Sequence, residues 1–307
     1  MQAIERSLSA VSVGAVQRHR NLAVFPLISG EAAAPGYSML DEALGSGRAF
    51  VRELTEGGSV PELAFENAGA EPVLLVDGEE LRGARQNRIL NISILVGAGR
   101  KLVIPVSCVE RGRWSYTSRH FDASERMLFA KARSSKASAV SESMRAGGPA
   151  RADQGRIWAE IDERFAAADQ SSETAAMADL YESEGARLVA YERAFEWQPG
   201  QAGAVFAIDG RPVAVELFDS PDTFRKFLKK AVGSFAMDAV AARRPVEKAP
   251  AKKKVEAFLG SVKAAAVERF PAAGEGEDLR LSGSGLAGGA LEAQGRVVHL
   301  SVFRVDG

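Results

Sequence analysis

The sequence predicts an α+β fold, in which an antiparallel β-rich N-terminal half, a sandwich or partly open barrel, packs with a helical and mixed C-terminal half. Three observations support this prediction. Apolar and polar side chains alternate along residues 88–96 and again along 101–109, the pattern of half-buried strands. Two more alternating runs flank Asp209-Gly210, a pair that favours a tight hairpin turn. Residues 220–235 instead place their apolar side chains at helical spacing.

The composition is that of a globular protein with a substantial core. The 307 residues are 46% hydrophobic and 26% charged, which suits one large domain or two ordinary ones. Lys and Arg number 39 and Asp and Glu 40, so the charge balance favours neither nucleic acid nor an anionic membrane as a partner. No run is long and apolar enough for a membrane span, and the N-terminus lacks a signal-peptide pattern. With Cys108 as the single cysteine, we expect a cytoplasmic protein.

The first part of the chain consists mainly of strand-like runs separated by turns. The expected strands lie at 21–28, 49–54, 59–67, 72–76, 88–96 and 101–109, with a short turn and helix at 37–45. Neighbouring strands that are joined by short turns usually pair with each other. Residues 21–118 are therefore expected to form one antiparallel, meander-like unit.

Helices are expected in the middle of the chain. Residues 122–145 are polar and rich in Ser and Ala, which is typical of a long surface helix or a mobile excursion. Asp153 is placed to cap a helix with an apolar stripe, and 171–183 predicts another short helix. We expect residues 187–197 to form a strand.

The last part of the chain begins with a basic segment that has no core-forming pattern. We expect 243–254 to be an exposed flexible connection, followed by a helix and two strands. This divides the chain into a β-rich lobe, a helical and hairpin lobe, the connection, and a C-terminal unit packed on the same core. Their predicted boundaries are 20–120, 121–242, 243–254 and 255–307.

The candidate site is the segment DGEELRGARQNR, residues 77–88, at the end of an expected strand. Glu79 and Glu80 could divide acid and base roles, or hold a hard cation such as Mg²⁺ against a phosphate. The arginines of this segment suit a phosphate or carboxylate, and its amides suit a sugar or base edge. The binding residues predicted here are Arg85, Gln86, Asn87 and Arg88.

A second motif, residues 108–114, is expected to lie beside the first. If strands 88–96 and 101–109 pair as a hairpin, Glu110 lies next to Asn87 and Arg88. Glu110 then joins the candidate acid, base or cation-holding groups, and Trp114 offers a stacking face. Cys108 has two interpretations: a thiolate nucleophile beside arginines, or a small apolar residue of the strand's buried face.

A structural interpretation of both motifs stays open. Charged turns are usually solvated, and Glu–Arg neighbours often form weak surface pairs or a buried network that fixes the fold. The spacing matches no metal-ligand motif, and three His with one Cys do not favour a zinc site. The sequence therefore predicts no metal site, and Mg²⁺ enters only as a cation that a phosphorylated ligand would bring.

Three stretches resemble the ARG and rhodanese-phosphatase-superfamily-associated protein domain family. They are VLLVDGEELRGARQNRILNISILV, IPVSCVERGRW and DQGRIW, and the resemblance covers residues 20–240, with a weaker match after 243. The positions that resemble the family pattern are Gly78, Glu79, Gln86, Asn87, Arg88, Ser107, Cys108, Glu110 and Trp114. The resemblance implies no catalytic residue set, and the family name points to nucleotide or ADP-ribose chemistry only by association.

Two hypotheses of function follow. In the first, the protein binds or acts on a phosphorylated or nucleotide-derived, ADP-ribose-like small molecule through its carboxylate, arginine and amide groups. Whether it is an enzyme stays open, and a hydrolase or transferase would be the class. In the second, the polar cluster is a buried network in a non-catalytic structural or interaction module. We expect a small-molecule ligand, neither membrane nor nucleic acid, and leave a protein partner open.

Overall fold

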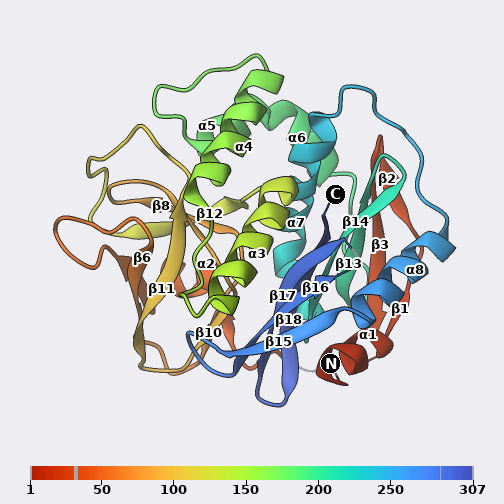
Figure 1. The fold of residues 1–307 in the computed structure, drawn as a ribbon, viewed down its shortest axis with the longest axis horizontal. Helices are drawn as coiled ribbons and strands as arrows, with labels where there is room; N and C mark the ends of the chain where they lie inside the picture. Colours follow the sequence, from red (N-terminus) through yellow and green to blue (C-terminus); the bar gives the residue numbers. More distant parts are fainter. Residues whose placement is uncertain (1, 31–33, 284, 306–307) are drawn as a thin grey trace.

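Antiparallel strands dominate the molecule, and helices pack between and outside them (Figure 1). The computed structural model describes residues 2–30, 34–283 and 285–305. Its elements are those of a strand-rich α+β fold, so the predicted fold class is confirmed. Within these ranges no helix is both long and apolar enough to cross a bilayer.

A nine-stranded antiparallel sheet joins the two ends of the chain. Its order is β1-β3-β13-β14-β18-β17-β16-β15, and β2 also pairs with β3. The strands are β1 (Val11–Val13), β2 (Gln17–His19), β3 (Leu22–Ser29), β13 (Gln201–Ile208), β14 (Arg211–Phe218), β15 (Ala266–Pro271), β16 (Glu277–Gly283), β17 (Leu286–Ala293) and β18 (Arg296–Arg304). β13 and β14 confirm the predicted hairpin, and both turn residues, Asp209 and Gly210, have positive φ, as a tight turn requires.

The first predicted strand lies in this sheet and not in the N-terminal meander. β3 pairs with β13 over residues Leu22 to Ile28, so the expectation of one meander over 21–118 is wrong for its first strand. Side chains alternate between the two faces of β3, and each face packs in a different core. This explains why β3 lies inside the nine-stranded sheet. Leu22 and Val24 pack in the main core, whereas Phe25 and Leu27 pack under α1 (Gln2–Ser9) and α8 (Lys252–Lys263).

The meander itself forms a six-stranded and a three-stranded sheet. The six-stranded sheet has the order β12-β8-β9-β11-β6-β5, and the three-stranded sheet the order β10-β7-β4. The strands are β4 (Ser38–Met39), β5 (Ala49–Arg52), β6 (Glu62–Asn67), β7 (Val73–Leu75), β8 (Glu79–Gly83), β9 (Arg88–Leu90), β10 (Ile94–Val96), β11 (Lys101–Cys108) and β12 (Phe121–Met127). The predicted strand 88–96 is thus split, because the chain bends at residues 91–93 and β10 pairs with β7.

The helices fill the space between the sheets. They are α2 (Leu40–Gly45), α3 (Ala130–Arg145), α4 (Gln154–Ala167), α5 (Met177–Ser183), α6 (Gly185–Glu192) and α7 (Pro221–Val240), besides α1 and α8. Figure 1 shows α3 and α7 in the middle of the molecule, and α7 contacts β12 as well as β13 and β14. The predicted cap of α4 is confirmed, because Asp153 accepts a hydrogen bond from the Arg156 backbone at 3.0 Å.

Three predictions about the helical part are wrong in detail. Residues 121–127 form strand β12, whose register shifts after Ala123, so its side chains do not show the period of two. Residues 185–192 form helix α6 and not a strand, since Leu188 and Tyr191 are buried at a spacing of three. α8 begins at Lys252, so the last three residues of the predicted connection are helical. The predicted domain boundaries stay a prediction.

Candidate functional site

The two glutamates of the DGEE segment are buried on a strand and do not lie in a solvated turn. Only Asp77-Gly78 forms the turn, and Glu79 and Glu80 open β8 with 1% of their surface exposed. Gly78 has φ +83°, and a Cβ there would lie 2.9 Å from Arg133 Nε. The absence of a side chain at Gly78 therefore lets the buried Arg133 lie against the turn.

Asp77 belongs to an enclosed charge network between α3 and the nine-stranded sheet. We define this network as Asp77, Ser93, Arg133, Lys136, Glu216 and His299. Lys136 Nζ donates to Asp77 at 2.7 Å, and Arg133 Nη1 lies 2.6 Å from Glu216. Arg133 also lies 3.5 Å from Asp77, so the two carboxylates share three cationic contacts.

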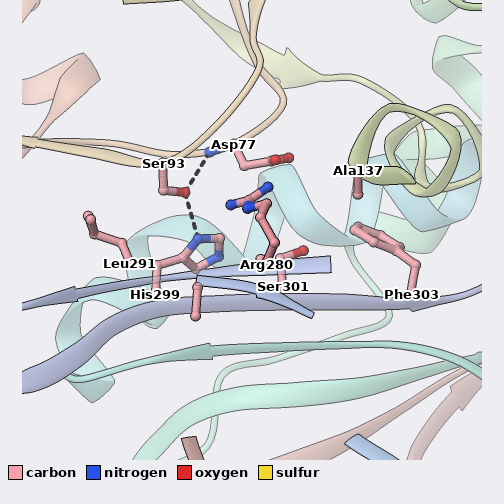
Figure 2. Close-up of a pocket in the computed structure, with 10 residues that line it drawn as sticks. Asp77, Ser93, Ala137, Arg280, Leu291, His299, Ser301 and Phe303 are labelled. Atoms are coloured by element: carbon pink, nitrogen blue, oxygen red, sulfur yellow. Dashed lines mark hydrogen bonds between the residues drawn. The ribbon is translucent and has the colours of Figure 1, made fainter. Parts of the chain in front are cut away.

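Ser93, from the bend between β9 and β10, and His299, from β18, complete the network (Figure 2). The Asp77 backbone N–H donates to Ser93 Oγ at 2.9 Å, and Ser93 Oγ lies 2.7 Å from His299 Nδ1. The other ring nitrogen, Nε2, lies 3.0 Å from Glu216. This Ser–His–Glu chain has the connectivity of a nucleophilic triad. Its adjoining cavity, however, measures about 10 Å³. That is room for one water molecule and not for a substrate.

The ionisation of the network follows from burial opposed by its partners. Burial raises the pKa of Asp77 and of Glu216, but the neighbouring cations outweigh it and hold both below their usual range. Burial lowers the pKa of Lys136 to about 8. The network therefore holds ionised carboxylates whose charges are compensated from within.

Glu79 and Glu80 point to opposite faces of β8, as neighbours on a strand do. Glu79 accepts a hydrogen bond from Lys230 of α7 at 2.7 Å and one from the Val76 backbone at 2.9 Å. Burial raises the pKa of Glu80 to about 7, against smaller opposing effects of Ser124 and Arg82. The two glutamates therefore have different surroundings and do not share one site.

Glu110 lies where the predicted strand pairing places it. β9 pairs with β11, with Cys108 opposite Arg88, and the Asn87 backbone donates to Glu110 at 3.0 Å. The carboxylate also accepts two hydrogen bonds from Arg113, at 2.6 and 2.8 Å. The predicted link between the two motifs is confirmed, and Glu110 is engaged by protein groups on both oxygens.

Cys108 is fully buried at the end of β11. Gln154 accepts from its backbone N–H at 2.7 Å and donates to its carbonyl at 2.8 Å. Burial raises the pKa of the thiol, although Arg88 opposes this. A raised pKa disfavours the thiolate, so the surroundings fit the interpretation of Cys108 as a core residue.

Arg88 is buried but only partly bonded. Its Nη1 donates to Gln86 Oε1 at 2.8 Å, whereas Nε and Nη2 have no hydrogen-bond partner in the described ranges. Its guanidinium carbon lies 5.8 Å from the ring centroid of Trp114, a residue that is 45% exposed. Arg88 therefore lies just behind an aromatic side chain that reaches the surface.

In front of this region lies an open hollow, which we call the arginine depression. Its volume is about 920 Å³. Its lining consists of Arg52, Glu53, Thr55, Glu56, Arg85, Tyr116, Thr117, Ser118, Arg119 and His120. The Arg85 guanidinium lies 4.5 Å from the ring centroid of Tyr116 and 5.5 Å from that of Trp114. The depression thus presents cations together with aromatic faces.

The structure brings some of the predicted residues together and separates others. Arg85 lines the depression, Trp114 adjoins it, and Arg88 lies behind Trp114. Gln86, Asn87, Cys108 and Glu110 form the bonded layer around Arg88. Glu79 instead pairs with α7.

Of the residues that line the depression, only Arg85 is among the site residues predicted from the sequence. The charged and aromatic lining residues that the sequence did not mark include Arg52, Glu53, Tyr116 and Arg119. In the sequence, these residues were indicated only weakly, by the charged end of the run AFVRE and by the aromatic residues of segment 114–120. These indications were ambiguous because solvated charges and loop aromatics are common on surfaces.

No metal centre is evident in the part of the chain that the structure describes. It contains no group of three or more His, Cys, Asp or Glu side chains that could hold a metal ion. The lining of the depression offers arginines, carboxylates, hydroxyls, an imidazole and a phenol ring.

The fold and the hollow define a class: a strand-rich α+β protein with an open cationic depression beside an enclosed polar layer. The chain belongs to the ARG and Rhodanese-Phosphatase-superfamily-associated Protein domain family, whose model matches residues 10–303. The match therefore includes the segment after residue 243, where the sequence motifs were weaker. No curated protein and no solved structure is detectably similar to the chain.

Proposed function

We propose that the protein binds a phosphorylated or nucleotide-derived small molecule in the arginine depression. The observation that carries this proposal is the state of Arg52, Arg85 and Arg119. All three line the depression, and none of them forms an ion pair with a described residue. Three guanidinium groups without a salt-bridge partner outnumber the two carboxylates of the lining, Glu53 and Glu56, and in a hollow of this size they favour a multi-oxygen anion such as a phosphate.

The aromatic residues of the depression support a ligand with a flat ring. Tyr116 is 49% exposed and Trp114 45% exposed. Aromatic rings stack on both bases and guanidinium groups, so two half-exposed rings beside arginines suit a ligand with a flat ring. A nucleotide combines the required anion with the required ring.

The same geometry favours binding over catalysis by the carboxylates. Glu79 and Glu110 accept hydrogen bonds from buried cations and backbone groups, which leaves them no open face toward the depression. This supports the network interpretation for these glutamates and the ligand interpretation for the arginines. A cytoplasmic location, where nucleotides are abundant, is part of the proposal.

The test is calorimetric titration with ADP, AMP, ribose 5-phosphate and pyrophosphate at low salt, with and without Mg²⁺. At least one of them should bind, and Arg119→Ala should weaken it about tenfold, the loss of one charge-assisted contact. Arg193→Ala is the matched control, because Arg193 is exposed and lies outside the lining of the depression. If none of the four compounds binds the wild-type protein, the proposal is wrong.

A further inference from the structure

Glu53 and Arg88 carry buried charges whose hydrogen-bonding capacity is not used. Both carboxylate oxygens of Glu53 are buried and have no hydrogen-bond partner among the described residues. The same holds for Nε and Nη2 of Arg88. A buried charged group without a partner costs free energy on the order of several kcal/mol, so its persistence calls for a ligand or a function.

The two side chains flank the same depression but do not pair. Glu53 lines the arginine depression, and Arg88 lies behind Trp114 at its edge. No ion pair within 4.0 Å joins them, although the charge of Glu53 opposes the lowering of the Arg88 pKa by burial. Both unused charged groups therefore adjoin the proposed ligand site.

The chemistry of the pair selects the occupant. An ionised carboxylate only accepts hydrogen bonds, and a guanidinium only donates them. A group that lies between them must donate to one and accept from the other, which a hydroxyl does and a phosphate oxygen does not. Two oxygens on Glu53 and two unpartnered nitrogens on Arg88, Nε and Nη2, match two adjacent hydroxyls.

Residues 53–60, which we call the strap, carry Glu53 and are held by two residues of the depression. The Glu56 carbonyl accepts hydrogen bonds from Arg85 Nη2 at 2.6 Å and from Tyr116 Oη at 3.2 Å. An anion that binds Arg85 competes with the Glu56 carbonyl for the same donor. Anion binding at Arg85 therefore acts on the segment that carries Glu53.

We propose that Glu53 and Arg88 form a hydroxyl-binding subsite at the edge of the depression, which accepts the vicinal diol of a phosphorylated sugar or nucleotide. This inference rests on the proposed function and narrows its ligand class. The phosphate binds the arginines of the depression, and the sugar hydroxyls bridge the carboxylate and the guanidinium.

The test compares ADP with 2′,3′-dideoxy-ADP in calorimetric titrations of the full-length protein, with pyrophosphate as a third probe. Removal of both hydroxyls should weaken binding by at least about tenfold. Glu53→Gln should reduce that ratio to about threefold or less. Glu56→Gln, at another carboxylate of the same depression, should leave the ratio unchanged. Melting temperatures establish that both variants are folded.

The outcomes separate the two proposals. If ADP and its dideoxy analogue bind equally, or pyrophosphate binds as tightly as ADP, the subsite is wrong while the anion site stands. If the tenfold ratio survives Glu53→Gln, Glu53 is not the partner of the diol and the subsite is wrong. If none of these probes, nor the other compounds of the first titration, binds, both proposals fall together. The wild-type comparison decides the matter even if a variant does not fold.

Discussion

The enclosed charge network and the arginine depression are both rich in charge, but they differ in how the charges are compensated. In the network, Asp77 and Glu216 are paired with Arg133 and Lys136, and the adjoining cavity holds about one water molecule. In the depression, three arginines have no carboxylate partner and face a hollow of about 920 Å³. The first arrangement holds layers of the fold together, and the second is open to a ligand.

The difference shows that charge density alone does not identify a binding site. The network even contains a Ser–His–Glu chain, yet its seryl oxygen accepts a backbone hydrogen bond and lies beside a cavity too small for a substrate. What distinguishes the depression is unused bonding capacity next to accessible volume. The predictions below test this distinction.

The largest effect is expected from breaking the enclosed network. Arg133→Met leaves Glu216 and Asp77 without their shared cation, and removal of one partner from a buried pair costs about 3–5 kcal/mol of unfolding free energy. Urea denaturation measures it.

The matched control lies on the same helix. Arg145→Met removes an arginine that pairs with Glu268, but this pair is solvent-exposed and should contribute little to stability. Equal losses in the two variants would contradict the structural role of the network.

The next effect concerns Glu80, a buried carboxyl whose pKa is raised. Its pKa is about 7 in the folded state against 4.5 for the unbound group, so the folded state binds the proton more tightly. The stability that the protonated Glu80 carboxyl contributes is therefore present below pH 4.5 and is lost as the pH rises through 7. The shift corresponds to roughly 3 kcal/mol.

Glu80→Gln removes this titration. Relative to wild type, the unfolding free energy of Glu80→Gln should increase by roughly 3 kcal/mol between pH 4 and pH 8. Glu79→Gln, the adjacent control, should instead destabilise at pH 8, because Lys230 loses one of its two carboxylate partners. A pH-independent difference for Glu80→Gln would show that this carboxyl is not desolvated.

The sequence predicted the elements whose pattern is local. The period of two in β11, the Asp209-Gly210 turn and the cap at Asp153 are determined by neighbouring residues, and all three are present. The pairing of β9 with β11 likewise placed Glu110 beside Asn87. The predictions that failed concern elements whose partners are distant in the sequence. For example, β3 pairs with a strand nearly 180 residues later.

The candidate site was predicted in part for the same reason. The motifs marked Arg85, Arg88 and Trp114, but the solvation of a carboxylate cannot be read from its neighbours along the chain. Glu79 is buried because α7 supplies Lys230, which lies 151 residues away. Glu53 joins the site only because the strap folds back onto Arg85. Charge and spacing indicate polar chemistry, and only tertiary contacts show which charges are compensated.

The smallest effect tests whether the strap lies against the depression as described. Gly58 has φ +77°, and a Cβ there would lie 2.9 Å from Arg85 Cδ and 3.2 Å from the Trp114 ring. Gly58→Ala should therefore cost about 1–2 kcal/mol of unfolding free energy, from the left-handed backbone and the contact together.

Gly57→Ala is the control for this strap. A Cβ at Gly57 would meet only Thr55 Oγ1 at 3.7 Å, and its φ lies outside the left-handed region, so the change should be neutral or stabilise by about 0.4–1 kcal/mol. Thermal melts of the two variants provide the comparison. If both alanines behave alike, the strap does not lie against Arg85 and Trp114. Glu53 and Arg88 would then be accessible to water, and their unused hydrogen-bonding groups would no longer argue for a ligand.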